Sequence, residues 1–265
     1  MKLTMLGTGN AAVTECYNTC FVLEDKGETL LVDGGGGFVV EKLKKAGFNW
    51  QDMRHIFVTR KHIDHLLGII WMIRMISQGM NRGSFEGEAW IYSHSEVIDI
   101  LRTMADTLLS EKETRHIGER LHLVPLADGE EFTALSRRVQ VFDIGSTKAR
   151  QFGFTLTCDE GKITCCGDEP YNPCEENYAR GSDWLLHEAF CLYDERDFFK
   201  PYQKHHSTVK DACELAESLG IKNLVLYHTE DKHIKERKAL YTAEGKQYYS
   251  GNLFVPDDLE SIGLF

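Results

Sequence analysis

The sequence has 265 residues, of which 42% are hydrophobic and 27% are charged, a composition typical of a folded globular protein. The formal net charge of −11 argues against extended nucleic acid as a partner, because nucleic-acid-binding proteins usually present a strongly basic face. No apolar run approaches the roughly 20 residues that span a bilayer, so we expect no membrane contact.

No linker rich in Pro, Gly or Ser divides the chain, so we predict a single domain over residues 1–265. The eight cysteines are scattered and the N-terminus lacks a signal-peptide pattern, so we expect reduced thiols in the cytoplasm. Cys165, Cys166 and Cys174 could suggest a zinc knot, but the sequence has no second CxxC pair, so we interpret them as buried free thiols. If a local basic patch exists, it lies at 200–206.

Short apolar runs bounded by turn residues open the chain and predict a β-rich start. The strands predicted in this half lie at 3–9, 20–24, 29–37 and 53–60. Residues 38–47 have apolar positions at helical spacing and end on a glycine suited to a C-cap. A second helix, from Ile63 to Gly79, is apolar nearly all round and should therefore be buried, with its N-terminus pointing at His62 to His65.

Strands and helices also alternate through the second half of the chain. Strands are predicted at 90–94, 138–144, 184–190 and 223–228, and a hairpin turns around 159–161. Helices are predicted at 96–109 and 207–220, the latter with Ser207 as N-cap and Gly220 as C-cap. The predicted class is α/β, with two sheets, outer helices and polar residues at strand ends.

The sharpest chemical signal follows the strand that ends near residue 60. His62, Asp64 and His65 come together where the predicted buried helix begins. Imidazole and carboxylate groups in combination suit zinc, iron or manganese. The alternative is that they only decorate the helix N-terminus, where the dipole favours Asp but disfavours clustered histidines.

Residues 58–68, VTRKHIDHLLG, resemble the HxHxDH signature of the metallo-β-lactamase superfamily. Further matches follow in order along nearly the whole chain. They are LLVDGGGG (30–37), CCGDEP (165–170) and LVLYHTED (224–231), and LLHEAF (185–190) and HHST (205–208) resemble the HEAT and HST motifs of RNase Z and its phosphodiesterase relatives. The resemblance implies an αββα four-layer sandwich with a site at the strand ends between the sheets.

The resemblance also implies one metal position rather than two. The first histidine of HxHxDH is Arg60 here, and Gly145 stands where the third motif places a histidine, so the first position keeps only His62. The implied ligands of the second position are all present. They are Asp64, His65 and His228, with Asp168 able to bridge. We favour zinc as the single divalent ion, with iron or manganese as alternatives.

Arg60 cannot ligate a metal, and its permanent charge would repel a dication at the vacated position. It could instead hold a phosphate or carboxylate of the substrate, because a guanidinium makes bidentate contacts with such groups. Alternatively, Arg60 merely pairs with Asp33 or Asp168 and fills space. Both interpretations stay open.

His206 matches the histidine that lies near the scissile phosphate in RNase Z-like enzymes, where it could donate a proton to the leaving oxygen. Glu188 matches the HEAT glutamate, which would orient that imidazole. With Asp64, these are the predicted catalytic residues. We interpret His187 as structural support and His205 as solvated, while His116 reaches the site only if its loop folds over it.

Between position 145 and Asp168 there is room for a hairpin but not for the long tRNA-gripping arm of bacterial RNase Z. We therefore predict metal-dependent hydrolysis of a small phosphodiester, or of a similar anionic substrate, by a metal-activated water. The alternative is a catalytically impaired binding or sensing protein. Transfer-RNA 3′ processing and lactamase or thioesterase chemistry fit less well, and a homodimer is an open alternative.

Overall fold

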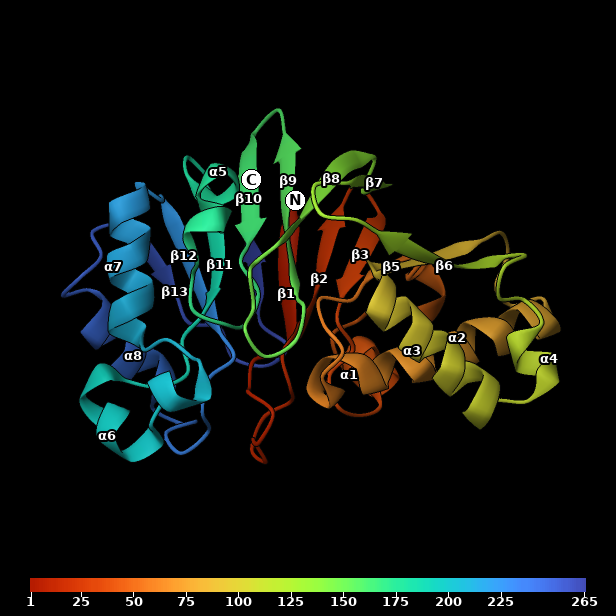
Figure 1. Ribbon diagram of the computed structural model, residues 1–265, viewed down its shortest axis with the longest axis horizontal. Helices are drawn as coiled ribbons and strands as arrows, with labels where there is room; N and C mark the ends of the chain where they lie inside the picture. Colours follow the sequence, from red (N-terminus) through yellow and green to blue (C-terminus); the bar gives the residue numbers. More distant parts are fainter.

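The computed structural model describes residues 1–265 and contains two seven-stranded sheets packed face to face (Figure 1). The first sheet has the order β14 (Ser261–Gly263), β1 (Lys2–Gly7), β2 (Cys20–Asp25), β3 (Glu28–Val32), β4 (His55–Phe57), β5 (Ala89–His94) and β6 (Leu121–Leu126). The second has the order β13 (Asn252–Phe254), β12 (Asn223–Tyr227), β11 (Trp184–Glu188), β10 (Gly161–Cys165), β9 (Phe152–Cys158), β8 (Arg137–Asp143) and β7 (Glu131–Ala134).

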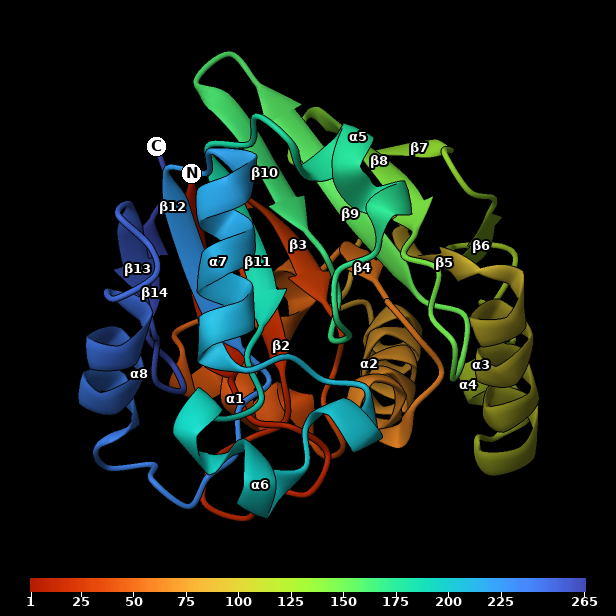
Figure 2. The ribbon, with the colours of Figure 1, turned by 60° about the vertical axis from the view of Figure 1, so that its left-hand side comes forward.

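Helices cover the outer face of each sheet, so the predicted four-layer αββα sandwich is confirmed (Figure 2). The first sheet is covered by α1 (Val39–Lys45), α2 (Ile63–Arg82) and α3 (Ser95–Leu108), and the second by α7 (Val209–Leu219) and α8 (Arg237–Gly245). Three shorter helices lie in the connections: α4 (Glu111–Thr114), α5 (Glu176–Ala179) and α6 (Arg196–Phe199).

The strands alternate between two apolar surfaces. In β3, Leu30 and Val32 point into the core between the sheets, whereas Leu31 points outward into the core beneath the helices. Because both faces of this sheet are covered, the strand carries consecutive apolar residues rather than a polar and apolar alternation.

Three details of the predicted helices were wrong. α2 runs to Arg82, three residues past Gly79, and it is not buried all round, because Ile63 is 70% exposed and Trp71 41% exposed. The N-cap of α7 is Thr208 rather than Ser207: its side chain accepts a hydrogen bond from the Asp211 amide, and the Asp211 carboxylate reaches back in a capping box. Gly220 is the C-cap, as predicted.

Strand β4 is shorter than the predicted 53–60 because the chain leaves the first sheet after Val58, whose amide still donates to the Tyr92 carbonyl, and crosses to the second. The Phe152 amide donates to the Thr59 carbonyl at 3.0 Å, and Arg60 forms an isolated bridge with Gln151. This crossing places Arg60 between the two sheets.

The predicted hairpin is the antiparallel pair β9 and β10, with Cys158 opposite Gly161, and it makes up most of the chain between Gly145 and Asp168. Of the three cysteines interpreted as buried thiols, Cys165 and Cys166 are buried and free, but Cys174 is exposed, because it lies in a short surface turn rather than in a strand. None of the helices combines the length and hydrophobicity needed to cross a bilayer.

Candidate metal centre and active site

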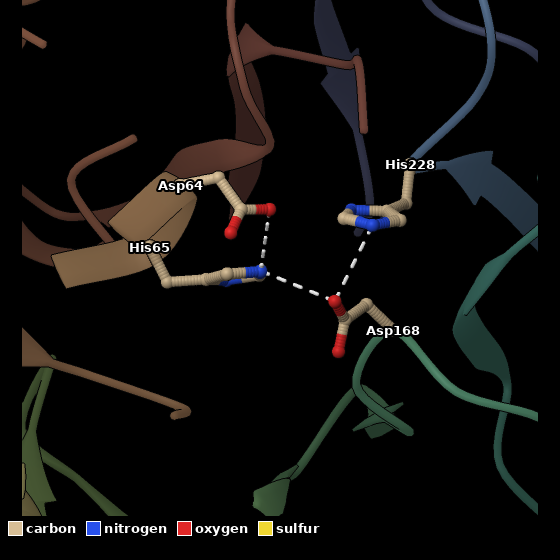
Figure 3. A group of neighbouring side chains, drawn as sticks. All are labelled: Asp64, His65, Asp168 and His228. Carbon is tan, nitrogen blue, oxygen red and sulfur yellow. Dashed lines mark hydrogen bonds and ion pairs between the residues drawn. The ribbon is translucent and has the colours of Figure 1, made fainter. Parts of the chain in front are cut away.

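Four buried side chains converge where strands of both sheets end (Figure 3). Asp64 and His65 lie in the first turn of α2, Asp168 follows β10 and His228 follows β12. One potential ligand atom from each residue lies within 4.8 Å of the other three. The Asp168 Oδ2 atom is 3.1 Å from His65 Nε2 and 3.3 Å from His228 Nε2. Two imidazoles and two carboxylates are donors that suit a zinc, iron or manganese ion.

Asp33 fixes the orientation of one of these ligands. Its Oδ2 atom lies 2.7 Å from His65 Nδ1, and its two oxygens also accept from the amide and hydroxyl of Thr59, both at 2.8 Å. The contact turns His65 Nε2 toward the cluster, as outer carboxylates do for metal-binding histidines. Asp33 itself adopts a positive φ of 59°, a strained conformation that is common at functional sites.

Neighbouring charges shift the pKa values of the residues in this cluster. Burial alone would raise the pKa of Asp168, but His65, His228 and Arg60 hold it well below its usual range. Burial lowers the pKa of His228 to about 3, so this imidazole is neutral and able to ligate. For His65, burial is outweighed by Asp33, Asp168 and Asp64, which raise its pKa well above the usual value. The proton on His65 therefore balances the carboxylates, a role that a bound metal ion would take over.

Arg60 lies beside this cluster with 1% of its side chain exposed. Its Nη1 atom donates to Asp168 Oδ1, and to Gln151 Oε1 at 3.2 Å. Its Nη2 atom donates to Glu169 Oε1 at 3.1 Å. Arg60 could have contacted substrate or paired with a carboxylate, and this geometry fits pairing with Asp168. Asp33, the other candidate partner, instead bonds Thr59 and His65. A direct contact with substrate would require these carboxylates to release the guanidinium.

His62, which we predicted among the metal ligands, lies outside the four-residue group. It is the N-cap of α2, and its Nε2 atom lies 3.2 Å from Arg60 Nη2. The guanidinium therefore occupies the space that this imidazole would share with a metal ion.

His206 and Glu188, the predicted proton donor and its orienting group, lie beside the cluster. The His206 ring stacks on Phe190, with ring centroids 4.9 Å apart, and lies 5.3 Å from the His228 ring. Glu188, fully buried at the end of β11, accepts from the Ser207 amide with one oxygen, and its other oxygen lies 3.6 Å from His206 Nδ1. Neither of those two atoms has another partner, so they are placed to pair with each other.

Other histidines serve structure. His187 Nδ1 lies 2.7 Å from the Glu188 carbonyl, a contact that supports the strand end as predicted. His205 is exposed and contacts Thr147, in agreement with its interpretation as a solvated residue. His116 bonds Asn81 near the C-terminal end of α2, so it does not reach the site at the other end of that helix.

The family of the chain follows from comparison with known proteins. A model of the family described as anti-Pycsar protein Apyc1 matches residues 1–248. The chain belongs to this family. This Apyc1-family protein is also 25% identical to the ribonuclease Z of Nitrosopumilus maritimus over 287 residues, covering 91% of the chain and 95% of the ribonuclease. It is therefore a member of the metallo-β-lactamase superfamily, in the RNase Z-like branch, as the motifs predicted.

Solved structures agree on the fold. YhfI from Bacillus subtilis, a metallo-β-lactamase fold protein, superposes on the Apyc1-family chain with a TM-score of 0.81 at 17% identity, over 98% of both chains. The short form of human tRNase Z has a TM-score of 0.74 at 21% identity, over 100% of this chain and 99% of its own. At such identities the likeness shows the fold alone.

Three residues around Arg60 in this Apyc1-family protein were missed from the sequence. Glu169 and Gln151 bond the guanidinium, and Ser146 donates to Glu169 Oε1 at 2.8 Å. The only signal in the sequence is that Glu169 directly follows Asp168 in the CCGDEP motif.

Proposed function

We propose that this Apyc1-family protein hydrolyses a small phosphodiester at a single metal position formed by Asp64, His65, Asp168 and His228. The observation that carries the proposal is the convergence of these four buried donors within 4.8 Å. Its relatives named ribonuclease Z are by name hydrolases of RNA phosphodiesters, which supports the same bond type here.

The donor set fits a divalent ion, and we favour zinc, with iron or manganese as alternatives. When bound, such an ion lowers the pKa of water and polarises a phosphoryl oxygen. His228 Nδ1 is buried without a partner, so the position of this ring is not explained by hydrogen bonds within the protein. Its Nε2 atom faces Asp168, as a ligand of a shared ion would.

His206 is the proton donor to the leaving oxygen in this proposal. Stacking on Phe190 fixes the plane of its ring beside the four donors. The Glu188 carboxylate, 3.6 Å from Nδ1, orients the imidazole and leaves Nε2 for the substrate. Glu188 is itself held by the Ser207 amide, so the orientation of His206 depends on the chain segment before α7.

The proposed substrate is compact and anionic. Between Gly145 and Asp168 the chain forms the hairpin of β9 and β10 and no long arm, and the net charge of −11 disfavours a long polyanion. Whether two chains associate stays a prediction, to be tested by light scattering.

One observation favours a second candidate, a binding or sensing protein without turnover. Arg60 occupies the space of the first metal position, and superfamily members that cleave phosphodiesters commonly use two metals. A binding protein would retain affinity for a phosphodiester but release no product.

A parallel screen separates these functions. Purified protein is supplied with zinc, iron(II) or manganese and tested on bis-p-nitrophenyl phosphate, nitrocefin and a glutathione thioester. The proposal predicts that bis-p-nitrophenyl phosphate is hydrolysed, with release of p-nitrophenol, and that the other two substrates are not. Asp64→Ala should lose both the metal and this activity, whereas Asp159→Ala, which removes an exposed carboxylate at the tip of the hairpin, should keep both. Retention of metal and activity by Asp64→Ala would refute the assignment.

A further inference from the structure

Four side-chain atoms contact the terminal nitrogens of Arg60: Gln151 Oε1, at 3.2 Å from Nη1, and three atoms of residue types that can also ligate a metal ion. Asp168 Oδ1 accepts from Nη1, Glu169 Oε1 lies 3.1 Å from Nη2, and His62 Nε2 lies 3.2 Å from the same nitrogen. Arg60, Asp168 and Glu169 are all nearly completely buried. The guanidinium is thus enclosed by two carboxylates and one imidazole, the donor types that bind zinc or iron.

Without Arg60, this arrangement would leave uncompensated charge in the interior. Glu169 would lose its only cationic partner and Asp168 would lose one of its cationic partners, and a buried carboxylate without a cation is strongly unfavourable, so the position favours a cation. A guanidinium satisfies the demand permanently, because it keeps its charge at every accessible pH and cannot act as a ligand. A dication and the guanidinium cannot occupy the position together.

Gly145 offers no side chain, whereas Glu169 Oε1 lies 3.1 Å from Arg60 Nη2. Gly145 has a φ of 70°, and a Cβ atom there would lie 3.3 Å from Cys174 Sγ, so a histidine at this position would be strained. The next residue, Ser146, instead donates to Glu169 Oε1 at 2.8 Å. The loop of Gly145 and Ser146, which contributes no metal ligand, therefore holds the carboxylate of Glu169 in position.

We propose that Arg60 is a built-in cation that replaces a metal ion, and that His62, Asp168 and Glu169 form a latent metal site that Arg60 keeps closed. This inference concerns the number of metal ions and goes beyond the proposed hydrolysis. It shares only Asp168 with the position proposed above, so the two can fail separately.

The test counts metal ions per chain by elemental analysis, after equilibration with zinc and removal of the excess. The wild-type protein should hold about one ion, and Arg60→His should hold about two, because the substitution removes the charge and adds an imidazole. Arg60→Lys is the matched control: it retains the cation and should stay at about one ion. With cobalt(II), the electron paramagnetic resonance spectrum of Arg60→His should show coupling between neighbouring ions.

Adding Glu169→Gln to Arg60→His should return the count to about one, because an amide is a much weaker ligand than a carboxylate. Two ions in the wild-type protein would overturn the claim that Arg60 replaces a metal ion. This measurement does not depend on the folding of any variant. A folded Arg60→His protein that keeps one ion, or an Arg60→His, Glu169→Gln protein that keeps two, would overturn the latent site. Circular dichroism with and without zinc establishes that each variant folds.

Failure of the proposed hydrolase function would give metal counts that differ from those expected on failure of the latent site. If the wild-type protein holds no metal, the single-metal hydrolase is refuted. The latent site is still supported if Arg60→His then gains an ion that is lost on adding Glu169→Gln but not on adding Asp64→Ala.

Discussion

Replacement of Glu175 by glutamine should stabilise the protein, and increasingly so as the pH rises. Glu175 is fully buried; one carboxylate oxygen accepts from the Asn172 amide at 2.8 Å, and the other has no hydrogen-bond partner. Burial raises the pKa of this carboxyl to about 8, from 4.5. The folded protein therefore carries a neutral acid at pH values where the unfolded chain carries a carboxylate.

The sign and size of the effect follow from this difference. Because the folded-state pKa is raised, the contribution of Glu175 to stability is fully present below pH 4.5 and is lost as the pH rises toward 8. Each pKa unit corresponds to about 1.4 kcal/mol, so the wild-type protein loses roughly 3 kcal/mol between pH 5 and pH 8 through this residue. A glutamine cannot ionise, and its amide can make the same contacts, so Glu175→Gln avoids this loss.

Urea denaturation at pH 5 and pH 8, with wild-type protein and Glu175→Gln side by side, measures the effect. All other titrating groups are common to both proteins and cancel in the comparison. The difference in free energy of unfolding should be small at pH 5 and should favour the variant by roughly 3 kcal/mol more at pH 8. A difference that is independent of pH would show that Glu175 ionises alike in both states, and would refute the reasoning.

Three further predictions concern the site. His206→Ala should lower kcat for bis-p-nitrophenyl phosphate by about 10²- to 10⁴-fold at unchanged metal content, and Glu188→Gln should move the alkaline limb of the pH–rate profile to lower pH, because a proton donor acts only while it is protonated; unchanged turnover would exclude a role in proton transfer. Asp33→Asn should weaken zinc affinity by about 10- to 100-fold in a competitive chelator titration, and equal affinity would argue against its orienting role. Gly68→Ala should destabilise the protein by about 1 to 3 kcal/mol in urea denaturation, because the added Cβ would lie 1.9 Å from the Gly34 carbonyl oxygen. This clash outweighs the gain of about 1 kcal/mol in helix propensity. A more stable variant would contradict the close approach of the two backbones.

The convergence of the four candidate ligands could be predicted because each of them follows a strand whose apolar run is visible in the sequence. Parallel strands bring their carboxyl ends to one edge, so Asp168 after β10 and His228 after β12 had to meet there. Asp64 and His65 come from the adjacent start of α2. A residue directly after a predicted parallel strand can therefore be assigned to this edge of the sheet from a short stretch of sequence.

The partners of Arg60 could not be predicted, because they depend on how the two sheets pack. Asp33 and Asp168 were equally plausible partners from the sequence, and the crossing of the chain after β4 decides for Asp168. Glu169 showed no periodicity or spacing that marked it. The exposure of Ile63 was missed for a related reason: an apolar helix face is buried only where another element covers it, and none covers the first turn of α2 on that side.

The central claim is that one metal position remains and that Arg60 fills the other. Anomalous diffraction from crystals of protein purified without added metal, combined with elemental analysis of the same preparation, tests it most directly. We expect one anomalous peak among Asp64, His65, Asp168 and His228, with the Arg60 guanidinium still bonded to Asp168 and Glu169. A second fully occupied metal ion beside His62, with Arg60 displaced, would contradict the account.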